Sequence, residues 1–237
     1  MTLVTFTKVS PRVRVHLSFQ PELPVPKHIE EEVDRLWERA KSEKDVYNSP
    51  LFCLHSHDEE RIFGKFLEYR YFMATRYNPE LVKVLDVHPL GVSGITMCND
   101  SVLVGTRDIK LALYPGYLEL VPSGSIETRA CQHGEVDFFM QLMWELEEEA
   151  HIAEKYVKAI RPLGLFYSED VGVYDLGMVI TCSLQEYEVA EFESSPEYPL
   201  LRWLPISEWQ EMMASPEAKI VPLSRAMWDA YIKEARG

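Results

Sequence analysis

The sequence predicts an α/β protein in which residues 86–237 form the main domain and residues 1–85 a smaller α+β extension. Two observations lead to this prediction. From residue 88 onward, strand-like apolar stretches lie on both sides of one central helix, the pattern of a sheet covered by helices. The segment 1–85 instead mixes short strands, a proline-rich stretch and a charged amphipathic helix. With 237 residues, 46% of them hydrophobic, the chain can bury one large core and a smaller one.

The N-terminal extension opens with two alternating apolar stretches, LVTFTKV and VRVHLSF, on either side of Ser10-Pro11. This pattern predicts a hairpin or a strand pair, which a proline-rich segment at 21–26 ends. Residues 27–43 predict a helix and residues 47–80 a strand followed by a helix or loop. The apolar face of the predicted helix consists of Ile29, Val33, Leu36, Trp37 and Ala40.

The main domain begins with two strand patterns, GVSGITMC and SVLVGTRD, joined by a turn at Asn99-Asp100. The stretch YLELVPSG predicts another strand, and residues 135–150 predict the central helix. RPLGLFYSED and VYDLGMVITCSLQEYEV predict further strands. ISEWQEMMAS and LSRAMWDAYIKEA predict two closing amphipathic helices.

Composition excludes several classes of partner. A formal net charge of −14 argues against nucleic acid, because a phosphate backbone requires a basic footprint. No apolar run is long enough to suggest a membrane span, and the first residues lack the apolar core of a signal peptide. The four cysteines are scattered without a CxxC pair, as expected of reduced thiols. A cytoplasmic protein is therefore expected.

The central helix carries an unusual group of carboxylates. Glu145, Glu148 and Glu149 stand at i, i+3 and i+4, so about one helical turn places all three on one face. Their mutual repulsion costs helix stability, and a bound Mg²⁺ or Mn²⁺ would offset it, since these cations prefer carboxylate oxygens. The alternative is a solvated acidic face to which Glu147 also belongs.

The residues before and within this helix resemble the signature of the Nudix hydrolases. That signature has a loop glycine, a Gly-Glu pair, a helix with Arg-Glu-apolar-any-Glu-Glu and a Gly-apolar close. In this chain the matching residues are Gly124 for the loop, Gly134 and Glu135 for the pair, Glu145, Leu146, Glu148 and Glu149 for the helix and Ile152 for the close.

Three departures from the signature stand out. The loop between Gly124 and Glu135 is about five residues longer. Trp144 takes the place of the arginine, and His151 takes the place of the closing glycine. Without that arginine Glu135 needs another partner, for which Arg129 is a candidate. Trp144 is expected to pack against the neighbouring strand or the inserted loop.

The resemblance implies a Nudix fold, an α/β/α sandwich with a mixed sheet. It also implies metal-dependent hydrolysis of the pyrophosphate bond of a nucleoside diphosphate linked to another moiety. Glu145, Glu148 and Glu149 would hold Mg²⁺ or Mn²⁺ and supply the base, and the Gly124 carbonyl could complete the coordination. A later loop often adds a carboxylate, for which Glu169 and Asp170 are candidates.

Candidate substrate contacts are Arg107, Lys110 and Glu127, although Arg107 and Lys110 could equally form a salt bridge at the end of a strand. Tyr114 and Tyr117 could stack on a base or pack beside Pro115. His55 and His57 could bind a metal or be incidental loop residues.

The N-terminal stretches YNSPLFCLHS and YRYFMATRYN resemble the leader of the Nudix subgroup that cleaves UDP-glucose and UDP-galactose. This resemblance makes a UDP-sugar the first candidate substrate and ADP-ribose the next. Trp144 and His151 favour an alternative, a catalytically impaired binding or regulatory module. In either case the partner is a small nucleoside diphosphate derivative, without nucleic acid or membrane, and the chain could form a homodimer.

Overall fold

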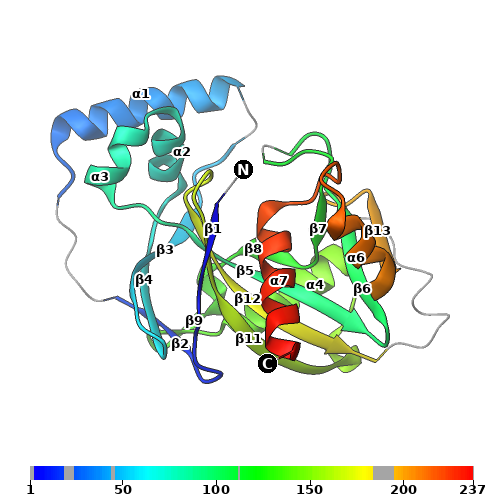
Figure 1. Ribbon diagram of the computed structural model, residues 1–237. Coiled ribbons are helices and arrows are strands. Elements are labelled where there is room, and N and C mark those ends of the chain that lie inside the picture. Colours follow the sequence, from blue (N-terminus) through cyan, green and yellow to red (C-terminus); the bar gives the residue numbers. More distant parts are fainter. Residues whose placement is uncertain (1–2, 19–23, 44–45, 112, 184–194, 237) are drawn as a thin grey trace.

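The computed structural model describes residues 3–18, 24–43, 46–111, 113–183 and 195–236. An eight-stranded sheet forms the centre of the molecule, and a five-stranded sheet with a group of helices lies beside it (Figure 1). Of the helices that the structure describes, none combines the length and the apolar character needed to cross a bilayer.

The large sheet runs in the order β1-β11-β12-β5-β6-β13, with β7 added on β6 and β8 added on β5. β12 and β5 are parallel, whereas the other neighbours are antiparallel, so the sheet is mixed. Its strands are β1 (Val4–Thr7), β5 (Leu90–Cys98), β6 (Ser101–Thr106), β7 (Leu118–Leu120), β8 (Ser123–Ser125), β11 (Val157–Ser168), β12 (Val173–Cys182) and β13 (Leu200–Pro205).

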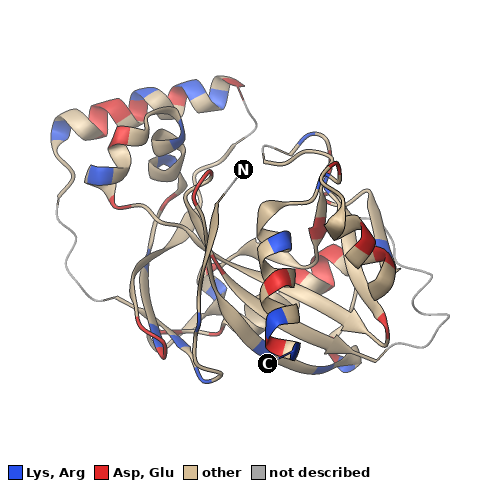
Figure 2. Cartoon of the chain, viewed as in Figure 1, with Lys and Arg blue, Asp and Glu red and all other residues tan. Residues whose placement is uncertain are grey.

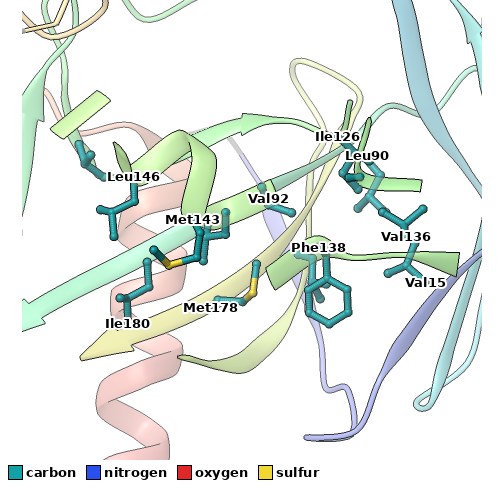
Figure 3. Packing of buried hydrophobic residues seen from close by; sticks show 14 of the residues in the cluster. Val15, Leu90, Val92, Ile126, Val136, Phe138, Met143, Leu146, Met178 and Ile180 are labelled. Carbon is teal, nitrogen blue, oxygen red and sulfur yellow. The ribbon is translucent and has the colours of Figure 1, made fainter. Parts of the chain in front are cut away.

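Helices cover both faces of this sheet, and each face has its own core. On one face α4 (Phe138–Ala150) packs Met143 and Leu146 against Met178 and other apolar side chains of the strands (Figure 3). On the other face α6 (Ile206–Ala214) and α7 (Pro222–Arg236) bury Trp209 and Trp228. The α/β/α sandwich with a mixed sheet is thus confirmed.

The second sheet has the order β3-β4-β2-β10-β9. Its strands are β2 (Arg14–Leu17), β3 (Pro50–His57), β4 (Arg61–Glu68), β9 (Cys131–Gln132) and β10 (Glu135–Val136). The accompanying helices are α1 (Lys27–Glu43), α2 (Tyr69–Tyr77) and α3 (Val82–Leu85), and the short 3₁₀ turns are η1 (Pro79–Leu81), η2 (Thr128–Ala130) and η3 (Glu154–Tyr156). As expected, α1 buries Val33, Leu36, Trp37 and Ala40, with Ile29 partly buried.

The hairpin predicted around Ser10-Pro11 is wrong. Both strands form, but β1 pairs with β11 of the large sheet, and β2 pairs with β4 and β10 of the second sheet. Alternation identifies a strand, whereas its partner depends on segments far away in the sequence. Strand β1 of the N-terminal segment thus joins the large sheet, and β10 from beyond residue 85 joins the second sheet. The division of the chain into domains at residue 85 remains a prediction.

Other expected boundaries also shift. Residues 47–80 form two antiparallel strands and a helix rather than one strand. The central helix begins at Phe138, because Glu135 and Val136 pair in β10 after the turn His133-Gly134. The turn Asn99-Asp100 joins β5 and β6 as expected. Residues 21–23 of the proline-rich segment and 184–189 of the last strand pattern lie outside the described residues.

Candidate functional site

Helix α4 begins and ends at identifiable caps, and these set the direction of its glutamates. The Asp137 side chain accepts a hydrogen bond from the Met140 amide at 2.9 Å, which satisfies one of the free N–H groups of the first turn. At the other end His151 adopts a left-handed conformation with a positive φ, where glycine is usual. Between the caps the buried Leu142 and Leu146 fix the apolar face of the helix.

Glu145 lies directly against β8. A Cβ atom placed on Gly124 would stand 2.1 Å from the carboxyl carbon of Glu145, so only glycine allows this approach. The Gln141 amide donates a hydrogen bond to this carboxyl group at 2.7 Å. Burial raises the pKa of Glu145 from 4.5 to about 7, although the Gln141 hydrogen bond opposes the shift.

Glu149, one turn further along α4, is only 4% exposed. Its carboxylate accepts a hydrogen bond from the Ser123 amide of β8 at 3.1 Å. Burial raises the pKa of Glu149 well above its ordinary value, and the negative charge of Glu197 raises it further. Within the described residues no hydrogen bond or ion pair joins Lys or Arg to Glu145 or Glu149, so neither carboxyl group has a basic partner that would favour its charged form.

Glu148 does not share this environment. Its side chain is 58% exposed and accepts a hydrogen bond from Arg129 at 2.8 Å. The Arg129 guanidinium also bonds Glu127 and lies 4.2 Å over the centroid of the Trp144 ring. Trp144 therefore packs against the inserted loop, as expected. The proposed pairing of Arg129 with Glu135 is wrong.

Glu135 lies in β10 of the second sheet, where Arg14 bonds it at 3.2 Å. The preceding Gly134 has a positive φ, which the tight turn between β9 and β10 requires. The inserted loop therefore becomes part of the second sheet, and this displaces Glu135 from the helix. Leu146 and Ile152, the apolar motif residues, are fully buried in the core.

Glu197 is a further carboxylate at this site that the sequence analysis missed. It lies between β12 and β13, and its carboxyl group is within hydrogen-bonding reach of Glu149. Burial raises the pKa of Glu197 as well, although the positive charge of Arg107 opposes the shift. No local pattern distinguishes Glu197 from its acidic neighbours, because its position depends on tertiary contacts.

Glu169 and Asp170, the two acids suggested as the later-loop carboxylate of the site, occupy the turn between β11 and β12. There the Glu169 amide bonds the Leu3 carbonyl at 3.2 Å, and Tyr114 donates its hydroxyl hydrogen bond to the Asp170 carboxylate. Tyr114 and Tyr117 pack against each other with ring centroids 5.5 Å apart, in keeping with the packing interpretation.

The three candidate substrate contacts lie at different places. Arg107 follows β6 and forms an ion pair with the buried Glu119 of β7. Lys110 lies exposed in the following turn, and Glu127 is exposed beside Arg129. Arg107 thus forms a salt bridge at the end of a strand. The substrate roles of Arg107, Lys110 and Glu127 remain proposals.

A second buried acid, Asp175, is connected to β8, the strand that Glu149 also contacts. Asp175 of β12 accepts a hydrogen bond from the Ser93 hydroxyl at 3.0 Å, and that hydroxyl lies 3.0 Å from the Ser123 hydroxyl. Burial raises the pKa of Asp175 from 3.8 to about 7, although the Ser93 hydrogen bond opposes the shift. Ser123 therefore contacts both the Asp175 network and, through its amide, Glu149.

The carboxyl groups on α4 are chemically suited to bind a divalent cation, although they do not form a preformed ligand cage. In the part of the chain that the structure describes, no three His, Cys, Asp or Glu side chains converge closely enough to hold a metal together. The same limit applies to His55, which lies 3.8 Å from Asp86. The half-buried Glu145 and the buried Glu149 nevertheless offer carboxyl oxygens without a basic partner, the ligand type that Mg²⁺ and Mn²⁺ prefer. Acidic residues gather on α4 (Figure 2).

No protein-family model and no curated protein sequence matches the chain. Solved structures of Nudix proteins align with it. A NUDIX hydrolase from Alicyclobacillus acidocaldarius is 14% identical with a TM-score of 0.48, and the alignment covers 61% of this chain and 90% of that one. A mutT/nudix family protein from Listeria innocua is 12% identical with a TM-score of 0.47, over 62% of this chain and 93% of that one.

A third structure is a bifunctional NMN adenylyltransferase/ADP ribose pyrophosphatase from Francisella tularensis, complexed with AMP and a manganese ion. It is 15% identical with a TM-score of 0.47, over 71% of this chain and 47% of that one. With identities of 12 to 15% in these three structures, a function has to be argued from the residues of the site.

Proposed function

We propose that this protein is a Nudix-type pyrophosphohydrolase, which uses Mg²⁺ or Mn²⁺ to hydrolyse the pyrophosphate bond of a nucleoside diphosphate derivative. The observation that carries the proposal is the pair formed by the half-buried Glu145 and the buried Glu149, which lie against β8 without a basic partner among the described residues. Burial without a basic partner disfavours the charged form of a carboxyl group, and functional sites are where such groups gather.

The chain's own residues have distinct tasks in this proposal. Glu145 and Glu149 would hold the cation, with Glu148 and the Gly124 carbonyl as further candidate ligands. When bound, the cation neutralises phosphate oxygens and lowers the pKa of the attacking water. One of these glutamates would also accept the proton of the attacking water, and Glu145 and Glu149 are the candidate bases.

The substrate is proposed to be a nucleotide sugar, with UDP-sugars first and ADP-ribose next. This choice is supported by the N-terminal segment that resembles the UDP-sugar subgroup. Lys110, exposed in the loop after β6, is the proposed phosphate contact, with Arg107 and Glu127 as further contacts. We place the protein in the cytoplasm, where its four free cysteines would remain reduced, without a nucleic-acid or membrane partner and with a homodimer as one assembly.

One observation favours a second function, that of a binding or regulatory module. Glu148 is engaged by Arg129 on the exposed side of α4, so one of the three helix glutamates is already neutralised. A module of this kind would bind a nucleotide with metal but would not hydrolyse it.

Substitution of single carboxylates tests both functions. The parent protein, Glu148→Gln and Glu149→Gln are assayed for hydrolysis and binding on one panel of UDP-sugars, ADP-ribose and related compounds, with Mg²⁺ and Mn²⁺. Glu147→Gln is the matched control, because Glu147 is exposed on the same turn of α4. The Glu149 variant should lose at least about 100-fold in turnover, as expected when a general base is removed.

The outcomes separate the alternatives. Turnover in the parent and in Glu147→Gln, with loss in Glu149→Gln, supports the hydrolase. Metal-dependent nucleotide binding without turnover in any protein supports the binding module. If neither binding nor turnover occurs with any divalent metal, the proposed function is withdrawn.

A further inference from the structure

Tyr198 occupies a position that requires a glycine opposite it. Its side chain is fully buried, and its ring lies directly on Gly105 of β6. A Cβ atom on Gly105 would stand 2.3 Å from the Cδ1 atom of Tyr198, which is an impossible contact. The absence of a side chain at residue 105 thus allows the aromatic ring to lie flat against the strand.

The Tyr198 hydroxyl is held by the buried acid Glu119. It donates a hydrogen bond to the Glu119 carboxylate at 2.8 Å, and Arg107 forms an ion pair with the same carboxylate. Arg107 also donates to the Leu113 carbonyl at 3.0 Å, which ties the loop after β6 to this network. Glu119 is therefore a buried anion with two donors, in contrast to Glu145 and Glu149.

Backbone contacts connect this network to the candidate site. The Asp108 amide donates to the Glu197 carbonyl at 2.8 Å, and the Tyr198 amide donates to the Ser195 hydroxyl at 3.1 Å. Glu197 directly precedes Tyr198 and reaches Glu149. A short segment without helix or strand thus keeps one carboxyl group in the site while its neighbour is fixed in the core.

We propose that Tyr198, held by Gly105 and Glu119, is the positioning residue that keeps Glu197 beside Glu149. The proposal rests on the proposed function, because it gives Glu197 a part in the same carboxylate site. The hydrogen bonds of Tyr198 go to Glu119 and Ser195, and among the described residues none joins it to Glu145 or Glu149. Its effect on metal binding and on turnover therefore passes through Glu197, and it should disappear when Glu197 lacks its charge.

The test combines Tyr198→Phe, Glu197→Gln and the double variant, each as the full chain. Tyr198→Phe keeps the ring on Gly105 and removes only the hydroxyl group. Tyr71→Phe is the matched control, since its hydroxyl donates to Glu30 at 2.6 Å away from the candidate site. Two quantities are measured without substrate: hydrogen exchange of the Asp108 amide by NMR, and Mn²⁺ affinity by calorimetry.

Tyr198→Phe should speed exchange of the Asp108 amide about fivefold, the effect of losing one hydrogen bond, and leave the amides of α4 unchanged. It should weaken Mn²⁺ binding by a similar factor, and the double variant should bind no more weakly than Glu197→Gln alone. Tyr71→Phe should change neither quantity.

An unchanged exchange rate of the Asp108 amide in Tyr198→Phe would overturn the proposal. So would a double variant whose loss of Mn²⁺ affinity equals the product of the two single losses, since Tyr198 would then act independently of Glu197. If Tyr198→Phe does not fold, Ser195→Ala removes another contact of the same segment and replaces it in every measurement. A parent protein that neither binds Mn²⁺ nor hydrolyses the panel refutes the proposed function. In that case the exchange rate of the Asp108 amide alone still tests whether Tyr198 anchors the segment that carries Glu197.

Discussion

Two regions of the molecule collect carboxylates in opposite ways. Around α1 and α2, Arg70 bonds Asp34 at 2.6 Å and Glu68 at 3.1 Å and lies 3.2 Å from Glu30, with only 17% of its own side chain exposed. Helix α1 carries basic and acidic residues along its length (Figure 2). On α4, the half-buried Glu145 and the buried Glu149 have no basic partner in the described part of the chain.

This difference separates carboxylates that support the fold from carboxylates that are poised for a ligand. In the Arg70 network each acid lies close to a fixed positive charge, and hydrogen bonds lower the pKa of Glu68 although partial burial opposes the shift. In the α4 site burial dominates and raises the pKa values of Glu145 and Glu149. Only the second arrangement leaves carboxyl groups without a basic partner, at which a bound cation could replace the proton.

The largest expected effect is a loss of stability with rising pH that originates in the α4 site. Between pH 4.5 and about 7 the native state keeps the proton of Glu145, whereas the unfolded chain releases it. The free energy of unfolding therefore falls as pH rises through this window. At roughly 1.4 kcal/mol per pKa unit, the shift corresponds to about 3 kcal/mol. Urea unfolding without metal at pH 4.5 and pH 8 measures it.

Substitutions assign this pH effect to its source. Glu145→Gln should be more stable than the parent at pH 8 and should lose less stability between the two pH values. Glu147→Gln, exposed on the same helix, should behave like the parent. Mn²⁺ at pH 8 should stabilise the parent more than Glu145→Gln. The same slope in Glu145→Gln as in the parent would mean that other acids, such as Asp175, cause the effect.

The second effect concerns the Arg70 network, where a substitution should destabilise the fold, whereas Glu145→Gln should stabilise it at pH 8. Arg70→Met keeps much of the side-chain volume but leaves Glu30, Asp34 and Glu68 without their shared cation. Because charged hydrogen bonds are lost and three negative charges repel each other, the free energy of unfolding should fall by about 2 kcal/mol at pH 7. Thermal unfolding measured by circular dichroism checks this.

The control for Arg70 is Arg35→Met. Arg35 pairs with Glu32 at 2.7 Å on the surface of α1, with 64% of its side chain exposed. Surface pairs of this kind contribute little, so the loss should stay below about 0.5 kcal/mol. Equal losses for the two substitutions would contradict the contrast between a partly buried network and a surface pair.

Local periodicity predicted the elements that depend only on nearby residues. The apolar face of α1, the β5–β6 hairpin and helices α4, α6 and α7 could be read from spacing and turn residues. The pairing of β1 with β11 could not, because it joins segments far apart in the sequence, such as Val4 and Ser168. The same limit applies to β10, which the inserted loop carries away from the helix and into the second sheet.

The site follows the same division. Helical spacing put Glu145 and Glu149 on one face of α4, and in the structure both lie against β8, Glu145 at Gly124 and Glu149 at the Ser123 amide. Spacing also grouped Glu148 with them, but Arg129 of the inserted loop holds it on the exposed side. Glu197 could not be predicted, since tertiary contacts bring its segment to α4.

The smallest expected effect tests the end of α4. His151 ends this helix in a left-handed conformation, which is strained for any residue with a Cβ atom and open to glycine. His151→Gly relieves that strain but gives the unfolded chain more freedom, so the net gain should be about 0.5 kcal/mol. Urea unfolding measures the gain, and His151→Ala, which keeps a Cβ atom, serves as control and should gain nothing. A loss of stability in His151→Gly would mean that the imidazole makes a favourable contact that outweighs the strain. With a gain, Glu145 and Glu149 keep their positions, and the pH dependence of the variant should match that of the parent.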